Sequence, residues 1–223
     1  MANQHRPVLA LDGPSGSGKG TVGQSVALRK KWHYLDSGAI YRGLSWLAHD
    51  QEVASDDVSA LVELAQNMQL ICHIQLEDVA QIEINGQMVT DILRTEEIGE
   101  IASKIAPLAP VREALLGMQR RCLKAPGLVA DGRDMGTVVF PEAEFKVFLT
   151  ASAEIRAQRR FDQLKAKGFD VNLARLLESI QARDVRDSSR ATSPLKAAQD
   201  ATVLDTSDLT IEEVVTRILD LLD

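Results

Sequence analysis

Hydrophobic and polar positions follow two repeating patterns along this chain. Short runs that are almost entirely apolar predict buried strands, because a strand in the middle of a parallel sheet is covered on both faces. These runs span residues 8–12, 32–35, 127–130, 145–149 and 202–205. Most of the longer segments between them carry apolar residues three or four positions apart, which is the spacing of an amphipathic helix. The alternation predicts an α/β fold with a parallel central sheet flanked by helices.

Capping residues mark where several of the predicted helices begin. Asp36 precedes one helix and Asn172 precedes another, while Thr210 and Glu213 form a Thr-x-x-Glu capping box before the last. The predicted helices span residues 22–31, 36–49, 55–65, 98–105, 111–123, 153–167 and 172–187, and a final one from 210 onward. Gly168 ends the sixth of these helices.

The pattern changes in the middle of the chain, where β-like segments follow one another without helices between them. These segments span residues 70–74, 80–84 and 87–89. Asn85-Gly86 separates the last two, and this dipeptide favours the two-residue turn of an antiparallel hairpin. The sequence therefore predicts a small inserted β/helical subdomain at 67–107, within a core formed by 1–66 and 108–223.

The most informative short motif lies directly after the first predicted strand. It consists of Gly13, Pro14, Ser15, Gly16, Ser17, Gly18, Lys19, Gly20 and Thr21. A Gly-rich loop between a strand and a helix is the arrangement of a phosphate-binding P-loop, in which backbone N–H groups and the positive end of the helix dipole surround an anion. Lys19 supplies a cation for the outer phosphates of a nucleotide, and the Thr21 hydroxyl suits Mg²⁺.

Gly20 is a departure from the strict P-loop pattern, in which Ser or Thr follows the lysine directly. This variant is typical of nucleoside monophosphate kinases, so the departure favours that class among the P-loop proteins. A Gly-rich turn with an unrelated lysine is the simpler alternative. The strand before the loop and the helix that opens near Lys19 argue against it.

Composition and charge limit the classes to which the protein can belong. The chain has 223 residues, of which 45% are hydrophobic and 26% are charged, as expected for one globular domain with a small insertion. No run approaches the ~20 apolar residues of a membrane span. The net charge of −7 argues against a nucleic-acid-binding surface and favours small-molecule partners. We expect a monomer.

The start of the chain and the two cysteines indicate the cellular compartment of the protein. The first seven residues are polar and run into the first strand, which leaves no room for a signal peptide. The two cysteines, Cys72 and Cys122, lack the spacing of metal ligands, which favours reduced thiols; a disulfide between them is the alternative. We therefore expect a cytoplasmic protein.

Arginines and acidic residues form a second constellation in the latter half of the chain. The run 131–134, Asp-Gly-Arg-Asp, follows a predicted strand, and ligands of open α/β sheets bind beyond the carboxyl ends of strands. Arg183, Asp187 and Arg190 are four and three positions apart, so they share one face of a helix. One reading is a solvated face whose charges pair with one another. The other is a phosphate site, because several converging arginines recognise phosphate well.

At this point the chain strongly resembles the bacterial cytidylate kinases, which phosphorylate CMP and dCMP. The segments that carry the resemblance are 12–21, 35–42, 111–115, 131–141 and 183–190. They span nearly the whole chain in the family's order, and the run 131–141 is more specific than any P-loop match. The resemblance implies a P-loop kinase core, an inserted subdomain that binds the monophosphate, and a mobile helical lid at about 153–190.

The resemblance also implies a role for individual residues. The phosphate of the acceptor would contact Arg42, Arg133 and Arg183. The cytosine would be read by Ser103, Arg112, Asp134 and Arg190. The remaining assignments are Asp187 at the sugar, Ser37 and Asp131 in the same substrate pocket, and Arg159 near the donor phosphates. The groups expected to act on the transferring phosphoryl group are Lys19, Arg133 and Arg183.

The implied reaction is direct in-line transfer of the γ-phosphoryl group of ATP to CMP or dCMP, with Mg²⁺ and no covalent intermediate. Two alternatives stay open. The chain could phosphorylate another small acceptor, such as UMP, AMP or a shikimate-like molecule. It could also be a nucleotide-sensing module that binds ATP and transfers no phosphate. ADP release measured across a panel of acceptors separates the three.

Overall fold

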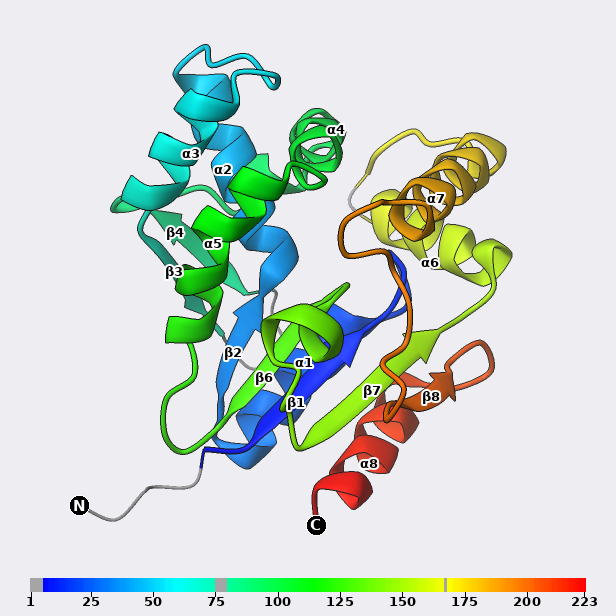
Figure 1. Ribbon diagram of the computed structural model, residues 1–223. Coiled ribbons are helices and arrows are strands. Elements are labelled where there is room, and N and C mark those ends of the chain that lie inside the picture. Colours follow the sequence, from blue (N-terminus) through cyan, green and yellow to red (C-terminus); the bar gives the residue numbers. More distant parts are fainter. Residues whose placement is uncertain (1–5, 75–79, 167) are drawn as a thin grey trace, which may run out of the picture.

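The computed structural model describes residues 6–74, 80–166 and 168–223. Within these residues the main sheet has five parallel strands in the order β2-β6-β1-β7-β8 (Figure 1). The strands are β1 (Val8–Asp12), β2 (His33–Asp36), β6 (Leu128–Gly132), β7 (Phe145–Thr150) and β8 (Thr202–Asp205). The parallel α/β sheet predicted from the apolar runs is confirmed, with strand ends displaced by one or two residues.

Helices cover both faces of the sheet, and the side chains of β1 alternate between them. Leu9 and Leu11 pack in one apolar cluster with residues of α1 (Lys19–Lys30) and α8 (Ile211–Leu222). Val8 and Ala10 pack in the other cluster, with residues of helices on the opposite face. This alternation is what the two-residue period of a strand dictates.

The opposite face carries a lobe of helices and a small antiparallel sheet (Figure 1). Its helices are α2 (Ser37–Asp50), α3 (Val58–Asn67), α4 (Glu96–Ile105) and α5 (Ala109–Arg121), with the 3₁₀ turn η1 (Ile92–Arg94). Its strands are β3 (Leu70–His73), β4 (Gln81–Ile84) and β5 (Gln87–Met88). Asn85 and Gly86 both have positive φ, of 50° and 83°, as the predicted hairpin turn requires. One continuous apolar cluster joins this lobe to the main sheet.

Two further helices lie across from α4 in Figure 1 and pack against each other. They are α6 (Ala153–Ala166) and α7 (Leu173–Ser188), in the segment that the sequence assigns to a lid. The helix predicted to end at Lys167 corresponds to α6, and Lys167 itself lies outside the described residues. No helix in the described part of the chain is both long and apolar enough to cross a bilayer.

Several elements differ from the sequence prediction: α3 begins at Val58, three residues after its predicted start, and the short helix η1 was not predicted. Helix α5 begins at Ala109, before Pro110, because proline is tolerated in a first turn, where its missing N–H has no intrahelical partner. The π-helix η2 (Met135–Val139) has no counterpart among the predicted elements. A residue far away in the sequence holds its first turn. The Asp12 carboxylate accepts hydrogen bonds from the N–H groups of Met135 and Gly136, each 2.8 Å long.

Candidate functional site

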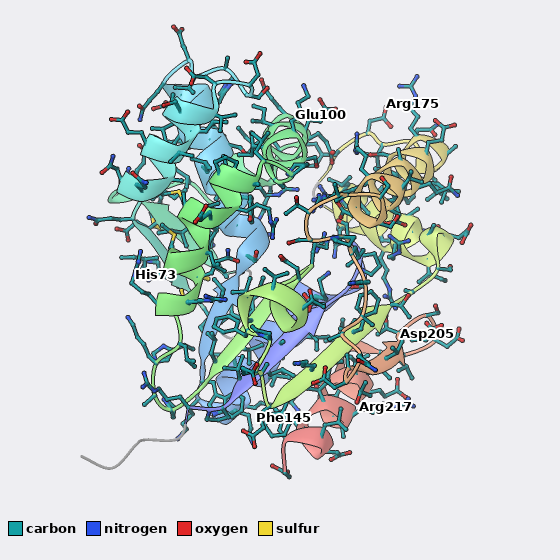
Figure 2. The ribbon with its side chains drawn as sticks, viewed as in Figure 1. His73, Glu100, Phe145, Arg175, Asp205 and Arg217 are labelled. Carbon is teal, nitrogen blue, oxygen red and sulfur yellow. The ribbon has the colours of Figure 1, made fainter. Side chains whose placement is uncertain are left out.

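A cavity lies beyond the carboxyl end of β6, between the α2–α5 lobe and α7. Its lining residues are Ser37, Gly38, Tyr41, Arg42, Ala102, Ser103, Ala106, Arg112, Gly132, Arg133, Asp134, Arg183, Asp187 and Arg190. The fold thus brings together, from five separate elements and the residues beside them, all the residues predicted for the acceptor site except Asp131. Arg175 of α7, by contrast, is exposed and points outward (Figure 2).

The glycine-rich loop follows β1 and leads into α1. Gly13 has a φ of 149°, and a Cβ atom there would lie 2.0 Å from the carbonyl oxygen of Leu149, so only glycine fits. The Lys19 ammonium group crosses the loop, donating to the Pro14 carbonyl at 2.8 Å and to the Ser17 hydroxyl at 3.3 Å. Thr21 lies in the first turn of α1 and is exposed. Because the first N–H groups of a helix have no intrahelical partner, those of this turn can bind a phosphate.

Lys19 lies in a buried group of charges at the ends of β2 and β6. Asp36 and Asp131 are neighbours in the sheet register, and both carboxylates act on the Lys19 ammonium group. Burial lowers the pKa of Lys19 and raises that of Asp131, and the charge of each opposes the shift of the other. Tyr34 is also buried and donates its hydroxyl to Asp131 Oδ2 at 3.1 Å. Asp131 thus lies beside the donor loop rather than in the lining of the cavity.

Three arginines surround the Asp187 carboxylate at the cavity wall. Arg133 Nε donates to it at 3.1 Å, and Arg190 forms an ion pair with its other oxygen. Burial acts to raise the pKa of Asp187, but the charges of Arg133, Arg190 and Arg183 outweigh burial and hold the pKa below its ordinary value. Asp187 is only 1% exposed, so the solvated-face reading of this helix is wrong for its central residue.

Arg183 completes this positive cluster. Its Nε is buried and has no hydrogen-bond partner among the described residues. Burial, and next to it the charge of Arg133, lower the pKa of Arg183 to about 10. Arg183 lines the cavity, and an anionic ligand such as a phosphate suits a wall with an unpaired guanidinium donor and excess positive charge.

Arg42 and Arg112 enter the cavity from the opposite lobe. Arg42 Nη1 donates to the Leu93 carbonyl at 2.5 Å. A Cβ at Gly99 would lie 3.1 Å from Arg42 Nη2, so that glycine makes room for the side chain. Arg112 pairs with Asp134, and both side chains are largely buried. This pair presents donors and an acceptor side by side, which suits the edge of a nucleobase.

The smaller polar residues and Arg159 have the following surroundings. Ser103 Oγ donates to the Gly99 carbonyl at 3.0 Å, and Ser37 Oγ donates to Gln119 Oε1 at 3.1 Å. Arg159 lies near the loop instead of the cavity, because it donates to the carbonyl and hydroxyl oxygens of Thr206 at 2.5 and 3.1 Å. The Thr206 hydroxyl in turn lies 3.3 Å from the Ser17 carbonyl.

Tyr41 is the main lining residue for which no role was predicted. It is buried, its hydroxyl has no hydrogen-bond partner among the described residues, and its ring lies 5.6 Å from the Arg112 guanidinium carbon. Helical spacing contained a usable signal, because Gly38, Tyr41 and Arg42 share one face of α2. The small residues of α4 that line the cavity, Ala102 and Ala106, show the same spacing.

Comparisons with known proteins identify relatives of this chain. Residues 9–223 match the model of the family described as cytidylate kinase. A cytidylate kinase of Aeromonas salmonicida is 54% identical over 216 residues, covering 97% of this chain and 94% of that protein. A cytidylate kinase of Methylococcus capsulatus is 54% identical over 209 residues, covering 94% and 93%.

A solved structure resembles the chain in fold. An uncharacterized protein from Eubacterium ventriosum aligns with a TM-score of 0.51 over 98% of this chain and 99% of that one. The two sequences are only 12% identical, so this likeness concerns the fold alone. The family match and the two relatives cover nearly the full chain. The chain belongs to the cytidylate kinase family.

Proposed function

We propose that this protein transfers the γ-phosphoryl group of ATP to the phosphate oxygen of CMP or dCMP, giving CDP or dCDP. The observation that carries the proposal is the cavity in which Arg133, Arg183 and Arg190 crowd around one carboxylate, beside a buried P-loop lysine. The three guanidinium charges exceed the single carboxylate charge, so this site can bind a monophosphate. The monophosphate would then lie next to the triphosphate site.

The reaction requires positioning and charge neutralisation more than covalent chemistry. Lys19 and the loop amides, from Gly13 to Thr21, hold the donor phosphates, with Arg159 close to the loop. Arg42, Arg133 and Arg183 hold the acceptor phosphate and spread the charge of the transferring group. Displacement then runs in line, with the acceptor oxygen forming a bond to the γ-phosphorus as the bond to the leaving ADP oxygen breaks.

The residues around Lys19 fit a magnesium ion. Mg²⁺ favours oxygen ligands and usually keeps several waters, so one or two carboxylates beside the phosphates suffice. Asp36 offers such an oxygen at the end of β2, and Thr21 offers a hydroxyl. When bound, Mg²⁺ neutralises charge on the donor phosphates.

Base choice follows from the Arg112–Asp134 pair. Cytosine carries an amino donor next to a ring acceptor, which match a carboxylate and a guanidinium, whereas uracil leaves the carboxylate facing a carbonyl. Ser103, Arg190 and Asp187 line the same cavity. We propose that Ser103 and Arg190 contact the base and that Asp187 accepts from a sugar hydroxyl. We therefore propose CMP and dCMP as acceptors in preference to UMP and AMP.

We further propose a monomeric, cytoplasmic enzyme. Cys72 and Cys122 are free, and burial raises the pKa of each thiol, as suits structural cysteines of a reducing compartment.

An acceptor panel tests the proposal. ADP release from MgATP is measured with CMP, dCMP, UMP, AMP and shikimate. We expect turnover with CMP and dCMP at low concentration, and none with shikimate. Lys19→Ala should remove most of the activity, whereas the exposed control Lys124→Ala should retain it. Release stimulated more by another acceptor than by CMP and dCMP, or stimulated by none, would contradict the proposal.

Asp134→Asn tests base reading directly. We expect kcat/KM for CMP to fall and the preference for CMP over UMP to shrink about tenfold or more, because one good polar contact is worth roughly 1–3 kcal/mol. Glu113→Gln, an exposed neighbour of Arg112, is the matched control and should keep the preference. An unchanged CMP-to-UMP ratio in a folded Asp134→Asn enzyme would remove Asp134 from base recognition.

A further inference from the structure

Arg156 lies in the first turn of α6, is 4% exposed, and has no part in the mechanism above. Its guanidinium group makes contacts in three directions. Nε donates to the Ala151 carbonyl at 2.9 Å, and Nη1 donates to the Ser15 carbonyl of the glycine-rich loop at 3.1 Å. Nη1 and Nη2 also donate to the two carboxylate oxygens of Asp184 in α7, at 3.0 and 2.5 Å. One side chain therefore joins the donor loop to α7.

Each end of this connection lies next to a substrate site. At the loop, a Cβ on Gly16 would lie 3.1 Å from Arg156 Cβ, so the start of α6 packs directly against the loop backbone. At the helix, Asp184 is adjacent to Arg183 and three residues before Asp187, and both of these line the acceptor cavity. A shift of Asp184 moves their side chains with it, because neighbours on a helix move as one body.

The chemistry of the contact favours arginine over any other cation. A planar guanidinium donates two parallel bonds to a carboxylate and still has donors left for backbone carbonyls, whereas an ammonium group acts as a single point charge. The pair is also sheltered, with side-chain exposures of 5% for Arg156 and 30% for Asp184, so solvent and salt screen it weakly.

We infer that Arg156 couples the donor and acceptor sites: by holding α7 to the glycine-rich loop, it makes occupation of the donor site favour binding of the monophosphate at Arg183 and Asp187. This inference rests on the proposed function. Arg156 acts through Asp184 and is a positioning residue. Coupling requires an element that both ligands bias. Helix α7 lines the acceptor cavity with Arg183 and Asp187, and Arg156 links it to the glycine-rich loop.

A binding cycle tests the inference. Calorimetry gives the Kd of CMP without and with a saturating non-hydrolysable ATP analogue and Mg²⁺, for the wild-type chain, Arg156→Lys and Asp184→Asn. In the wild type we expect the analogue to tighten CMP binding at least about fivefold. Both variants should still bind CMP, with a coupling factor close to one. Arg186→Lys, an exposed neighbour on α7, should keep the wild-type factor.

The outcomes distinguish coupling from a contact that only stabilises the fold. If the contact is purely structural, its removal lowers thermal stability or weakens CMP binding equally with and without the analogue. The ratio of the two Kd values then stays unchanged, and that result overturns the inference. The double variant should match either single variant, because both remove one interaction. If Arg156→Lys fails to fold, Asp184→Asn decides, since its side chain is the more exposed of the two. Wild-type binding of CMP without any donor effect overturns the inference alone, and no CMP binding overturns the proposed function as well.

Discussion

The Tyr34 hydroxyl lies beneath α1 and donates to Asp131, and Gly23 of α1 makes room for the ring. A Cβ at Gly23 would lie 3.0 Å from Tyr34 Cε2, closer than an ordinary contact. Burial raises the pKa of Asp131, while Lys19 and the Tyr34 hydrogen bond act to lower it. The protonation of this carboxyl group therefore depends on its neighbours.

Tyr34→Phe should change the pH profile of the reaction. The hydroxyl stabilises the charged carboxylate, so its removal raises the pKa of Asp131 further, and the carboxylate forms only at higher pH. The ascending limb of kcat/KM for CMP should move to higher pH by up to ~0.7 unit, the equivalent of one net hydrogen bond of ~1 kcal/mol. Rates at saturating MgATP between about pH 5.5 and about pH 9 measure it. A folded variant with an unmoved limb would show that Asp131 does not control this titration.

At the scale of elements, boundaries set by local side chains were the most predictable. Asp36 accepts a hydrogen bond from the Ala39 N–H, Asn172 from the Arg175 N–H, and Thr210 forms the expected capping box with Glu213. These signals lie within three residues of the helix they start, so the chain carries them whatever the tertiary context. The π-helix η2 has no such signal, because its cap is the carboxylate of Asp12, 123 residues away from Met135.

Helix α3 offers a test of such a local signal. The Asp57 side chain accepts a hydrogen bond from the Ala60 N–H at 3.0 Å and caps the helix. Asp57→Ala should lower the free energy of unfolding by about 1 kcal/mol and Tm by roughly 2–4 °C. Asp56→Ala, an exposed neighbour outside the cap, should change the free energy by less than about 0.5 kcal/mol. Activity should be unchanged in both, since α3 does not line the cavity. Equal Tm losses in the two variants would contradict the cap assignment.

At the scale of the whole molecule, the charge of the site is opposite to that of the chain. The net charge is −7, yet the cavity wall carries Arg42, Arg112, Arg133, Arg183 and Arg190 against two carboxylates, those of Asp134 and Asp187. The fold concentrates these arginines from α2, α5, α7 and the ends of β6 and α7. A local positive site of this kind draws a small anion out of solution, whereas the acidic surroundings disfavour long polyanions such as nucleic acids.

This charge distribution predicts how binding responds to salt. The affinity for CMP should fall as NaCl rises from about 0.05 M to about 0.5 M, because the Debye length shortens from well over 10 Å to a few ångströms. Cytidine, which has the same base and sugar without the phosphate, should bind more weakly and respond little to salt. Calorimetry of both ligands across the salt series measures the difference. Equal affinities for CMP and cytidine would contradict phosphate recognition by the arginine cluster.

The sequence by itself determined whatever depends on neighbours along the chain. The apolar runs predicted the five strands, the glycine-rich motif predicted the phosphate loop, and the residue order of the resemblance pointed to the family. Helical spacing also placed Arg183 and Asp187 on one face of a helix, but α7 ends at Ser188, so Arg190 reaches the cavity from beyond the helix end. These signals are local, because strand and helix periods and caps act over a few residues.

Only the tertiary structure decided which of these residues meet. The pairing of Arg112 with Asp134, of Tyr34 with Asp131, and of Arg156 with both Ser15 and Asp184 joins residues that are 22, 97, 141 and 28 positions apart. The burial that shifts the pKa values of Lys19 and Asp131 arises in the same way. Local propensity carries no information about such distant contacts. They are fixed by the packing of helices on the sheet, which sets the distances between charges and the water each one loses.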